Sequence, residues 1–230
     1  MISYAPLPHL KAAEDRLASA VAAFIPELGL NRLSLNAGAL SLGLSDGMRD
    51  LTAPNGAADI AAVLWRGHDA VLLTPEVEET LCAMKVRDKV GYLINLRIDE
   101  VSGEEAVAKS LMGFFVLPSH AVLYHRLLWE TSDHIWRLAG DTSLDENHYS
   151  KRLIVSGILT TVLMTRLSQG REAQLAQIAR NIGQVMEFEK FKAKVPVKPE
   201  ETLLKLAKSL GRLRFGRGED QSAELYLENP

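Results

Sequence analysis

The sequence predicts an all-α protein. Apolar residues recur at helical spacing along most of the 230 residues, and alternating β-branched runs bounded by turns are absent. Gly and Pro lie between successive apolar runs, where helices are expected to end. Helices are therefore expected over the ranges 10–24, 34–42, 46–53, 59–73, 76–97, 104–117, 119–138, 144–167, 172–191 and 200–217.

Local chemistry sets the expected bounds of these helices. Leu10, Leu17 and Val21 lie on one face of the first helix, and Pro26 and Gly29 are expected to end it. The turn at 54–56 precedes the helix at 59–73, and Pro118 ends the helix at 104–117. The prolines of 195–199 predict a linker. We therefore divide the chain into an N-terminal region (1–75), a helical body (76–194) and a terminal region of linker, helix and tail (195–230).

Composition narrows the class of protein. An apolar share of 47% with 24% charged residues is typical of a globular chain, and the net charge of −3 gives no general attraction to nucleic acid. The single cysteine, Cys82, fits a reducing cytoplasm and lies among apolar neighbours, so we expect it to be buried. The sequence contains neither an uncharged apolar run long enough to span a bilayer nor the pattern of a signal or transit peptide. A cytoplasmic protein of bacterial type is expected.

A helix-turn-helix pattern lies near the N-terminus. Residues 39–45 fit A-x-x-x-G-h-[ST], in which Ala39 allows close helix approach, Gly43 makes the turn and Ser45 caps the next helix. A long helix before such a motif is typical of TetR-like regulators, in which residues 46–53 would be the recognition helix. Binding to DNA phosphates requires uncompensated cations, and here acidic residues offset the basic ones (Arg32, Arg49 and Arg66 against Asp46, Asp50 and Asp59). Specific binding to duplex DNA is therefore not expected.

The segment from Trp136 to Arg152 is the most informative part of the chain. Gly140 can end one helix in a left-handed cap, and Ser143 with Glu146 forms a capping box for the next. Local helix chemistry gives no role to its other polar and aromatic members, Trp136, Asp141, Asp145, Asn147, Tyr149, Lys151 and Arg152.

This segment resembles the ubiquinone-biosynthesis accessory protein family (COQ-nine). The shared pattern is W-x-x-A-G-D-x-S-x-D-x-N-x-Y-[ST]-[KR]-R, residues 50–60 are also similar to the family, and the resemblance spans about residues 14–190. The family usually has Trp where this chain has His148. The resemblance implies a TetR-like fold, a bound lipid, and assistance to the di-iron hydroxylase that acts on demethoxyubiquinone.

The resemblance also implies a lipid pocket within the helical body. Large apolar side chains of the later helices are candidates for its wall, although a packed core has the same composition. The candidate lipid-binding residues are Leu96, Phe114, Phe115, Leu128, Trp129, Ile158, Val162 and Met164. The ligand class is an isoprenoid or another long-chain lipid.

Two surfaces are expected to bind partners. Asp145, His148, Tyr149 and Arg152 share one stripe of a helix that begins near residue 144, and we interpret them as the surface that docks on the hydroxylase. Residues 200–217 form a basic amphipathic helix that suits a membrane surface, or alternatively docks on the body. Its apolar face has Leu203, Leu206, Leu210 and Leu213, and its cations are Lys205, Lys208 and Arg212. Dimerisation through the helices around 144–191 is expected, as in TetR-like folds.

No arrangement of residues predicts catalysis, a metal site or a cofactor. Glu130 and His134 lie four apart, but a carboxylate-bridged di-iron site needs Glu-x-x-His pairs on two helices. Together with the resemblance, this favours a non-catalytic accessory protein, which the resemblance implies would present a quinone precursor to the hydroxylase. The alternatives are a ligand-responsive TetR-like transcription regulator and, less favoured, an enzyme that binds acyl chains.

Overall fold

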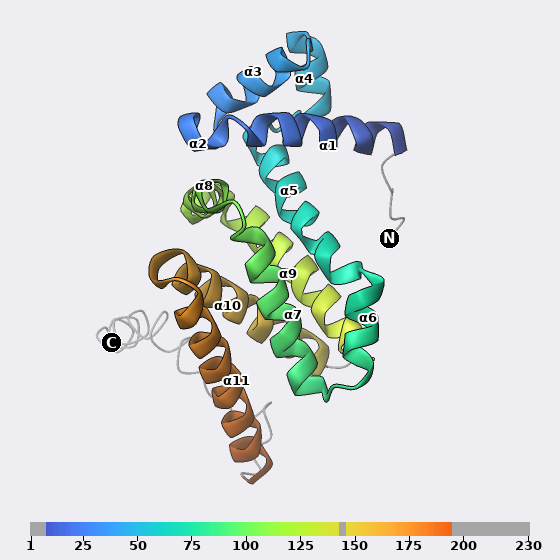
Figure 1. Cartoon of the computed structure of the whole chain (residues 1–230), viewed down its shortest axis with the longest axis vertical. Coiled ribbons are helices and arrows are strands. Elements are labelled where there is room, and N and C mark those ends of the chain that lie inside the picture. The colour runs from blue at the N-terminus through green and yellow to red at the C-terminus, as the bar shows by residue number, and fades with distance from the viewer. Residues whose placement is uncertain (1–7, 143–145, 195–230) are drawn as a thin grey trace, which may run out of the picture. The chain divides into compact units, whose positions relative to one another are not determined.

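The computed structural model describes residues 8–142 and 146–194 of the chain. Every regular element in these residues is a helix, which confirms the predicted all-α class (Figure 1). The elements are α1 (Pro8–Ala22), α2 (Ile25–Leu28), α3 (Arg32–Ser41), α4 (Asp46–Thr52), α5 (Ala57–Gly67), the 3₁₀-helix η1 (His68–Leu73), α6 (Pro75–Cys82), α7 (Val86–Val101), α8 (Glu105–Val116), the 3₁₀-helix η2 (Pro118–His120), α9 (Ala121–Leu138), α10 (Glu146–Gln169) and α11 (Arg171–Lys194).

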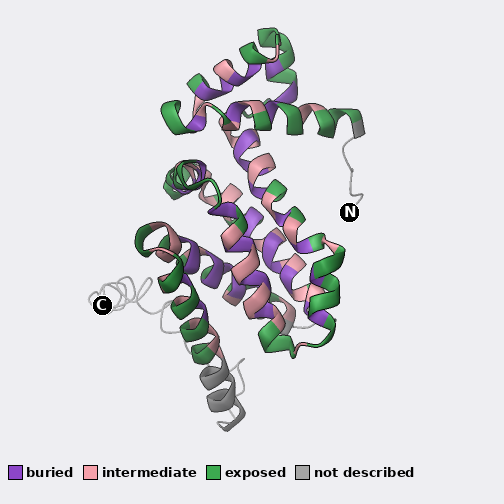
Figure 2. Ribbon diagram, viewed as in Figure 1, coloured by how far each residue is buried: buried purple, intermediate pink, exposed green. Residues whose placement is uncertain are grey.

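The helices up to Ile182 form one compact unit. In it α9 packs along α10, α1 packs against α3 and α5, and α7 packs against η1. Apolar side chains that the helical periodicity places on inner faces, such as Leu17, Leu93 and Leu127, are completely buried, whereas the outer faces are exposed (Figure 2). Burial of these stripes, rather than helix propensity alone, stabilises the individual helices.

The N-terminal helices show how proline is used. We expected Pro26 to end the first helix, but α1 already ends at Ala22, and Pro26 lies in the first turn of the short helix α2. Proline is tolerated in a first turn because the N–H that it lacks has no intrahelical acceptor there. Gly29, at φ 71°, ends α2.

The turn between α3 and α4 has the predicted chemistry. Gly43 has φ 67°, a conformation that glycine adopts without steric cost, and the Ser45 hydroxyl accepts a hydrogen bond from the Met48 N–H at 3.3 Å. Close helix approach depends on Gly38, because a Cβ built there would lie 2.5 Å from Val21 Cγ2.

Two expected helices are interrupted. The helix predicted at 76–97 is divided into α6 and α7 by residues 83–85, where Lys85 is extended at ψ 152°. The helix predicted at 59–73 becomes 3₁₀ after Gly67, which brings Asp69 to the buried side facing α7. Periodicity alone missed both interruptions, because the apolar spacing continues through them.

The later helices end at glycines. Gly140 (φ 92°) follows α9 and Gly170 (φ 86°) separates α10 from α11. The predicted capping box at Ser143 and the helix predicted at 200–217 lie outside the described residues. No single described helix is long and apolar enough to cross a membrane. By length and composition only, the bent pair of α8 with η2 and α9 passes the same test, which buried core helices also pass.

Candidate functional site

Trp136 of α9 and Lys151 of α10 form contacts, here called the α9–α10 clamp, that join the two helices beside the turn. The Trp136 indole N–H donates to the Lys151 carbonyl at 3.0 Å, and the Lys151 ammonium lies 5.3 Å from the centre of the Trp136 ring. The same ammonium forms an ion pair with the Asp141 carboxylate at 2.7 Å. Gly140 has φ 92°, a conformation in which the chain turns away from the axis of α9. This turn brings Asp141 within ion-pair distance of Lys151.

Arg152 is buried in the same cluster, with 1% of its surface exposed. Its guanidinium donates to Asp133 at 2.6 Å, to Asp141 at 3.2 Å and to the His148 carbonyl at 3.0 Å. The expectation that Arg152 lies with Tyr149 on an outward stripe is therefore wrong. The α9–α10 packing turns position 152 toward α9, where two carboxylates satisfy its charge.

The structure thus gives a role to residues that local helix chemistry left unexplained. Trp136, Asp141, Lys151 and Arg152 all form contacts that join α9 to α10. Asp145 of the expected docking stripe lies outside the described residues. Much of the sequence signature therefore stabilises a helix–helix junction rather than a surface.

An aromatic surface cluster, formed by Trp129, His148 and Tyr149, lies beside this junction. The ring centres are 5.8 Å apart for Trp129 and Tyr149, 6.3 Å for Trp129 and His148, and 5.2 Å for His148 and Tyr149. Tyr149 is 65% exposed, and the other two side chains are half-buried. Trp129 was expected in the wall of a lipid pocket, but it belongs instead to this partly exposed cluster.

The outward face of α10 extends this apolar surface. Leu153, one helical turn after Tyr149, is 68% exposed, and Met164, further along the helix, is 52% exposed. Between them Gly157 and Thr161 are also exposed, so this face has no charged side chain from Tyr149 to Met164. Exposed aromatic and aliphatic side chains on one helix face are typical of a protein-binding surface.

The candidate lipid-binding residues do not share one environment. Phe115, Leu128, Ile158 and Val162 are buried in the core, Leu96, Phe114 and Trp129 are half-buried, and Met164 is exposed. Met164 is therefore not part of an internal wall in this arrangement. Phe115 packs edge-on against Trp65 at 5.6 Å and stacks on Tyr124 at 4.9 Å, so its ring is held by core contacts.

A cavity of about 370 Å³ opens beside the α9–α10 clamp. It is lined by Val86, Trp136, Gly140, Asp141, Thr142 and Lys151. The mixture of an aromatic face, a carboxylate and an ammonium makes it a polar cavity with one apolar wall, which does not suit a long apolar chain.

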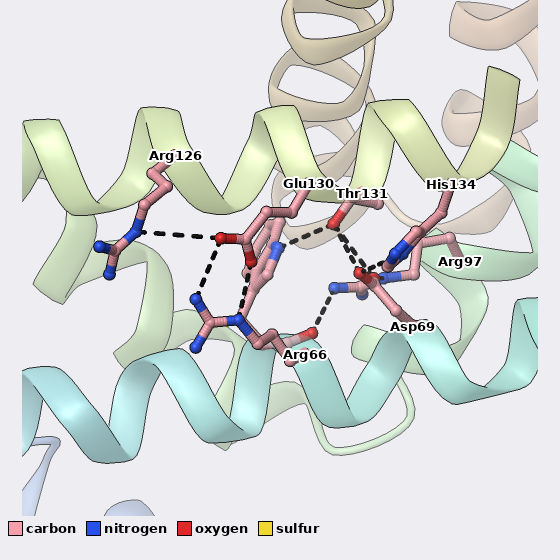
Figure 3. A network of polar contacts seen from close by, with 8 residues as sticks. Arg66, Asp69, Arg97, Arg126, Glu130, Thr131 and His134 are labelled. Atoms are coloured by element: carbon pink, nitrogen blue, oxygen red, sulfur yellow. Dashed lines mark hydrogen bonds and ion pairs between the residues drawn. The ribbon is translucent and has the colours of Figure 1, made fainter. Parts of the chain in front are cut away.

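A buried polar network joins η1, α5, α7 and α9, and sequence reasoning did not find it (Figure 3). The Arg97 guanidinium donates to the Asp69 carboxylate at 2.5 Å and to the Trp65 carbonyl at 2.8 Å. The Thr131 hydroxyl lies 3.0 Å from Asp69 Oδ2 and accepts from the Trp65 indole N–H at 3.0 Å. The paired groups satisfy one another in the core, which makes the network structural.

Two histidines lie next to this network, and their pKa values are shifted in opposite directions. Burial and the Arg97 charge lower the pKa of His68 to about 4, against the attraction of Asp69. The contact of His134 Nδ1 with Asp69 Oδ2, at 3.4 Å, raises the pKa of His134. Burial alone would raise the pKa of Asp69, but His134, Arg97 and Thr131 outweigh it and lower that pKa. Asp69 therefore remains ionised.

Glu130 and His134, whose spacing was considered for a metal site, contact different partners. Glu130 forms a two-point ion pair with Arg66 at 2.7 and 3.1 Å, while His134 faces Asp69 (Figure 3). Across the described ranges 8–142 and 146–194, no three His, Cys, Asp or Glu side chains are grouped so that they could hold a metal ion. Cys82 is exposed at the end of α6, so the expectation of a buried cysteine is wrong.

The expected recognition helix, α4, presents apolar rather than basic side chains. Its only arginine, Arg49, is 93% buried and binds Asp46 at 2.6 Å, Asp50 at 2.8 Å and Asn36 at 2.9 Å. Leu51, by contrast, is 74% exposed. A guanidinium already bound by two carboxylates is not available to neutralise a phosphate.

Comparison with known proteins identifies the segment that contains these features. A family model described as COQ9 matches residues 122–189. The ubiquinone biosynthesis protein COQ9, mitochondrial, of Xenopus tropicalis is 24% identical over 164 residues, which cover 67% of this chain and 50% of that protein. The chain thus spans about half the length of this curated relative, whose name places it in mitochondria, so the relative lends no support to the expected bacterial-type cytoplasmic location. These matches confirm the resemblance to the COQ9 family that the sequence predicted.

Proposed function

We propose that this protein is a non-catalytic accessory factor of ubiquinone synthesis, which docks on the demethoxyubiquinone hydroxylase and presents a lipid-like quinone precursor to it. One observation carries the proposal: the family match at 122–189 contains both the aromatic surface cluster and the buried ion pair of Arg152 with Asp133. The name of the relative gives the pathway.

The aromatic surface cluster is the proposed docking site. Aromatic side chains supply much of the binding energy of protein interfaces, because they bury a large area with little loss of conformational freedom. Tyr149 and Leu153 are mostly exposed in the isolated chain, and Trp129 supports Tyr149 from α9. The buried ion pair of Arg152 with Asp133 joins α10 to α9, so the aromatic surface cluster is already formed in the unbound protein.

The proposed ligand is an isoprenoid or another long-chain lipid. The buried candidates Phe115, Leu128, Ile158 and Val162 lie on α8, α9 and α10, and we propose that a lipid enters by separating these helices. The terminal helix with Leu203 to Leu213 and its cations is proposed as the membrane contact, and a homodimer through the helices around 144–191 is proposed as the assembly.

A TetR-like transcription regulator is less well supported. The only cation of α4 is bound internally, and exposed leucine and methionine side chains occupy the surface that would face DNA. We therefore propose that the N-terminal helices keep the arrangement of a TetR-like regulator but do not bind duplex DNA sequence-specifically.

The proposal is tested by co-purification of the hydroxylase from the same cells and by mass spectrometry of lipids extracted from the purified protein. Trp129→Ala and Tyr149→Ala should reduce hydroxylase recovery. Leu40→Ala is the matched control, because Leu40 is 78% exposed on α3, away from the matched segment. Equal recovery with folded Trp129→Ala and Tyr149→Ala variants would place the docking surface elsewhere, and the absence of any co-extracted lipid would contradict the carrier role.

A further inference from the structure

A second cavity, of about 300 Å³, is lined by residues from the end of α7, from α8 and from the turn between α10 and α11. It is separate from the aromatic surface cluster and shares no residue with the cavity beside Trp136. Its size is near the lower end of the range of small-molecule sites. It is lined by Ser102, Glu105, Lys109, Arg166, Leu167, Ser168 and Gly170.

Two buried donors in this cavity have no hydrogen-bond partner in the described part of the chain. Ser102, at the end of α7, is 93% buried, and its hydroxyl is unpaired. The Nε–H of Arg166, in the last turn of α10, is also buried and unpaired. Leaving such groups unsatisfied in a folded protein is unfavourable, and more so for a charged group. Their convergence on one cavity therefore points to a ligand that accepts hydrogen bonds.

The charges of the cavity favour an anion. Lys109 pairs with Glu105 at 2.6 Å, so these two charges compensate each other. The hydrogen bond and charge of Lys109, and then the charge of Arg166, lower the pKa of Glu105. Arg166 itself has no carboxylate within ion-pair distance among the described residues. The cavity thus has one excess positive charge on a side chain with several fixed donors.

The start of α11 adds to this preference. Gly170 lines the cavity and α11 begins at the next residue, so N–H groups of its first turn have no intrahelical acceptor. The helix dipole is positive at this end and stabilises an anion nearby. Helix terminus, guanidinium and hydroxyl together supply the donors that a phosphate group requires.

We propose that this cavity binds the phosphate group of a small ligand, with Arg166 and Ser102 as its principal donors. The inference does not depend on the proposed function. The phosphate can belong to a free phosphorylated compound or to a lipid headgroup, because both present the same oxyanion.

Calorimetric titration of the full-length protein at physiological ionic strength tests the site, with inorganic phosphate, pyrophosphate and monomeric dihexanoyl phosphatidic acid as probes. Saturable binding of at least one probe is expected. Arg166→Gln should weaken it by about tenfold or more. Ser102→Ala should weaken it less, and Glu105→Gln should strengthen it because an opposing carboxylate is removed. Arg180→Gln removes an exposed arginine of α11 outside the cavity and should have no effect.

The probes distinguish the source of the phosphate. If the short-chain phosphatidic acid competes with phosphate and binds more tightly, the natural ligand of the cavity is a lipid headgroup. If phosphate or pyrophosphate binds and the phosphatidic acid does not displace it, the natural ligand is a free phosphorylated compound. Either outcome supports the site. It is overturned if no probe binds saturably, or if folded Arg166→Gln, Ser102→Ala and Glu105→Gln bind like the Arg180→Gln control.

Discussion

The guanidinium of Arg152 on α10 donates a 2.6 Å hydrogen bond to the carboxylate of Asp133 on α9, and Arg152 is 99% buried. The same carboxylate also pairs with Arg137 at 2.6 Å, but that arginine has 71% of its side chain exposed. One acidic residue thus forms a buried and an exposed ion pair, which allows their contributions to be compared directly.

Arg152→Ala should lower the free energy of unfolding by up to about 3–5 kcal/mol, because Asp133 and Asp141 lose their buried partner and keep only the more exposed Arg137 and Lys151. Arg137→Ala should lower it by less than about 1 kcal/mol, since an exposed pair is screened by solvent. Urea denaturation of both variants is the measurement. A loss for Arg152→Ala no larger than that for Arg137→Ala would show that the buried pair adds nothing beyond the exposed pairs with Arg137 and Lys151.

The aromatic surface cluster should respond to substitution in both directions. Under the proposed function, Tyr149→Ala should weaken binding to the hydroxylase by about tenfold or more, the effect of removing an aromatic contact from an interface. His148→Trp should strengthen binding, because it enlarges the apolar area beside Trp129 and restores the residue that the family usually has. Surface plasmon resonance with immobilised hydroxylase gives both dissociation constants. Unchanged binding in both variants would show that the aromatic surface cluster is not part of the interface.

Acidification should destabilise the fold through His68. The pKa of His68 is about 4 in the folded chain, below its ordinary value of 6.5, so the unfolded chain binds the proton more strongly. Stability from this residue is therefore lost as the pH falls from about 6.5 toward 4. In His68→Asn, the free energy of unfolding should fall less steeply across this interval. Parallel curves for wild type and variant would show that His68 is solvated in the folded state.

His134 should act in the opposite direction. Its pKa is raised by Asp69, so it adds stability below its unfolded pKa of about 6.5, and that stability is lost as the pH rises through its folded pKa. His134→Gln should therefore lose more stability at acid pH than at alkaline pH, relative to wild type. Thermal unfolding across the pH range measures the difference, and a constant loss at every pH would contradict the assignment.

Gly38 should not tolerate a side chain. A Cβ there would lie 2.5 Å from Val21 Cγ2 and 2.8 Å from the Val21 nitrogen, so Gly38→Ala should force α1 and α3 apart and cost about 1–3 kcal/mol. Gly157, on the exposed face of α10, has no neighbour within 4 Å of such a Cβ. Gly157→Ala should instead stabilise by about 0.5–1 kcal/mol, the gain in helix propensity. Calorimetric melting temperatures that shift in the same direction would contradict this packing.

The fold was largely predictable because it depends on local patterns. Apolar spacing, the turn at Gly43 and the caps at Ser45 and Gly140 act within a few residues, and the structure confirms each of them. The division at 83–85 was not predictable from periodicity, because the spacing of apolar residues on both sides suits one continuous helix as well as two.

The candidate site was predictable only in part. The sequence alone determined most of the helices, the segment that matches the COQ9 family, and the outward aromatic residue Tyr149. Tertiary structure decided the role of Arg152, which helical spacing placed beside Tyr149 but which α9 holds inside. It also decided the Asp69 network, whose partners Arg97 and Thr131 lie 28 and 62 residues away along the chain. Helical periodicity specifies the face on which a side chain lies. Whether that face meets water, a carboxylate or another helix depends on packing between segments far apart in sequence.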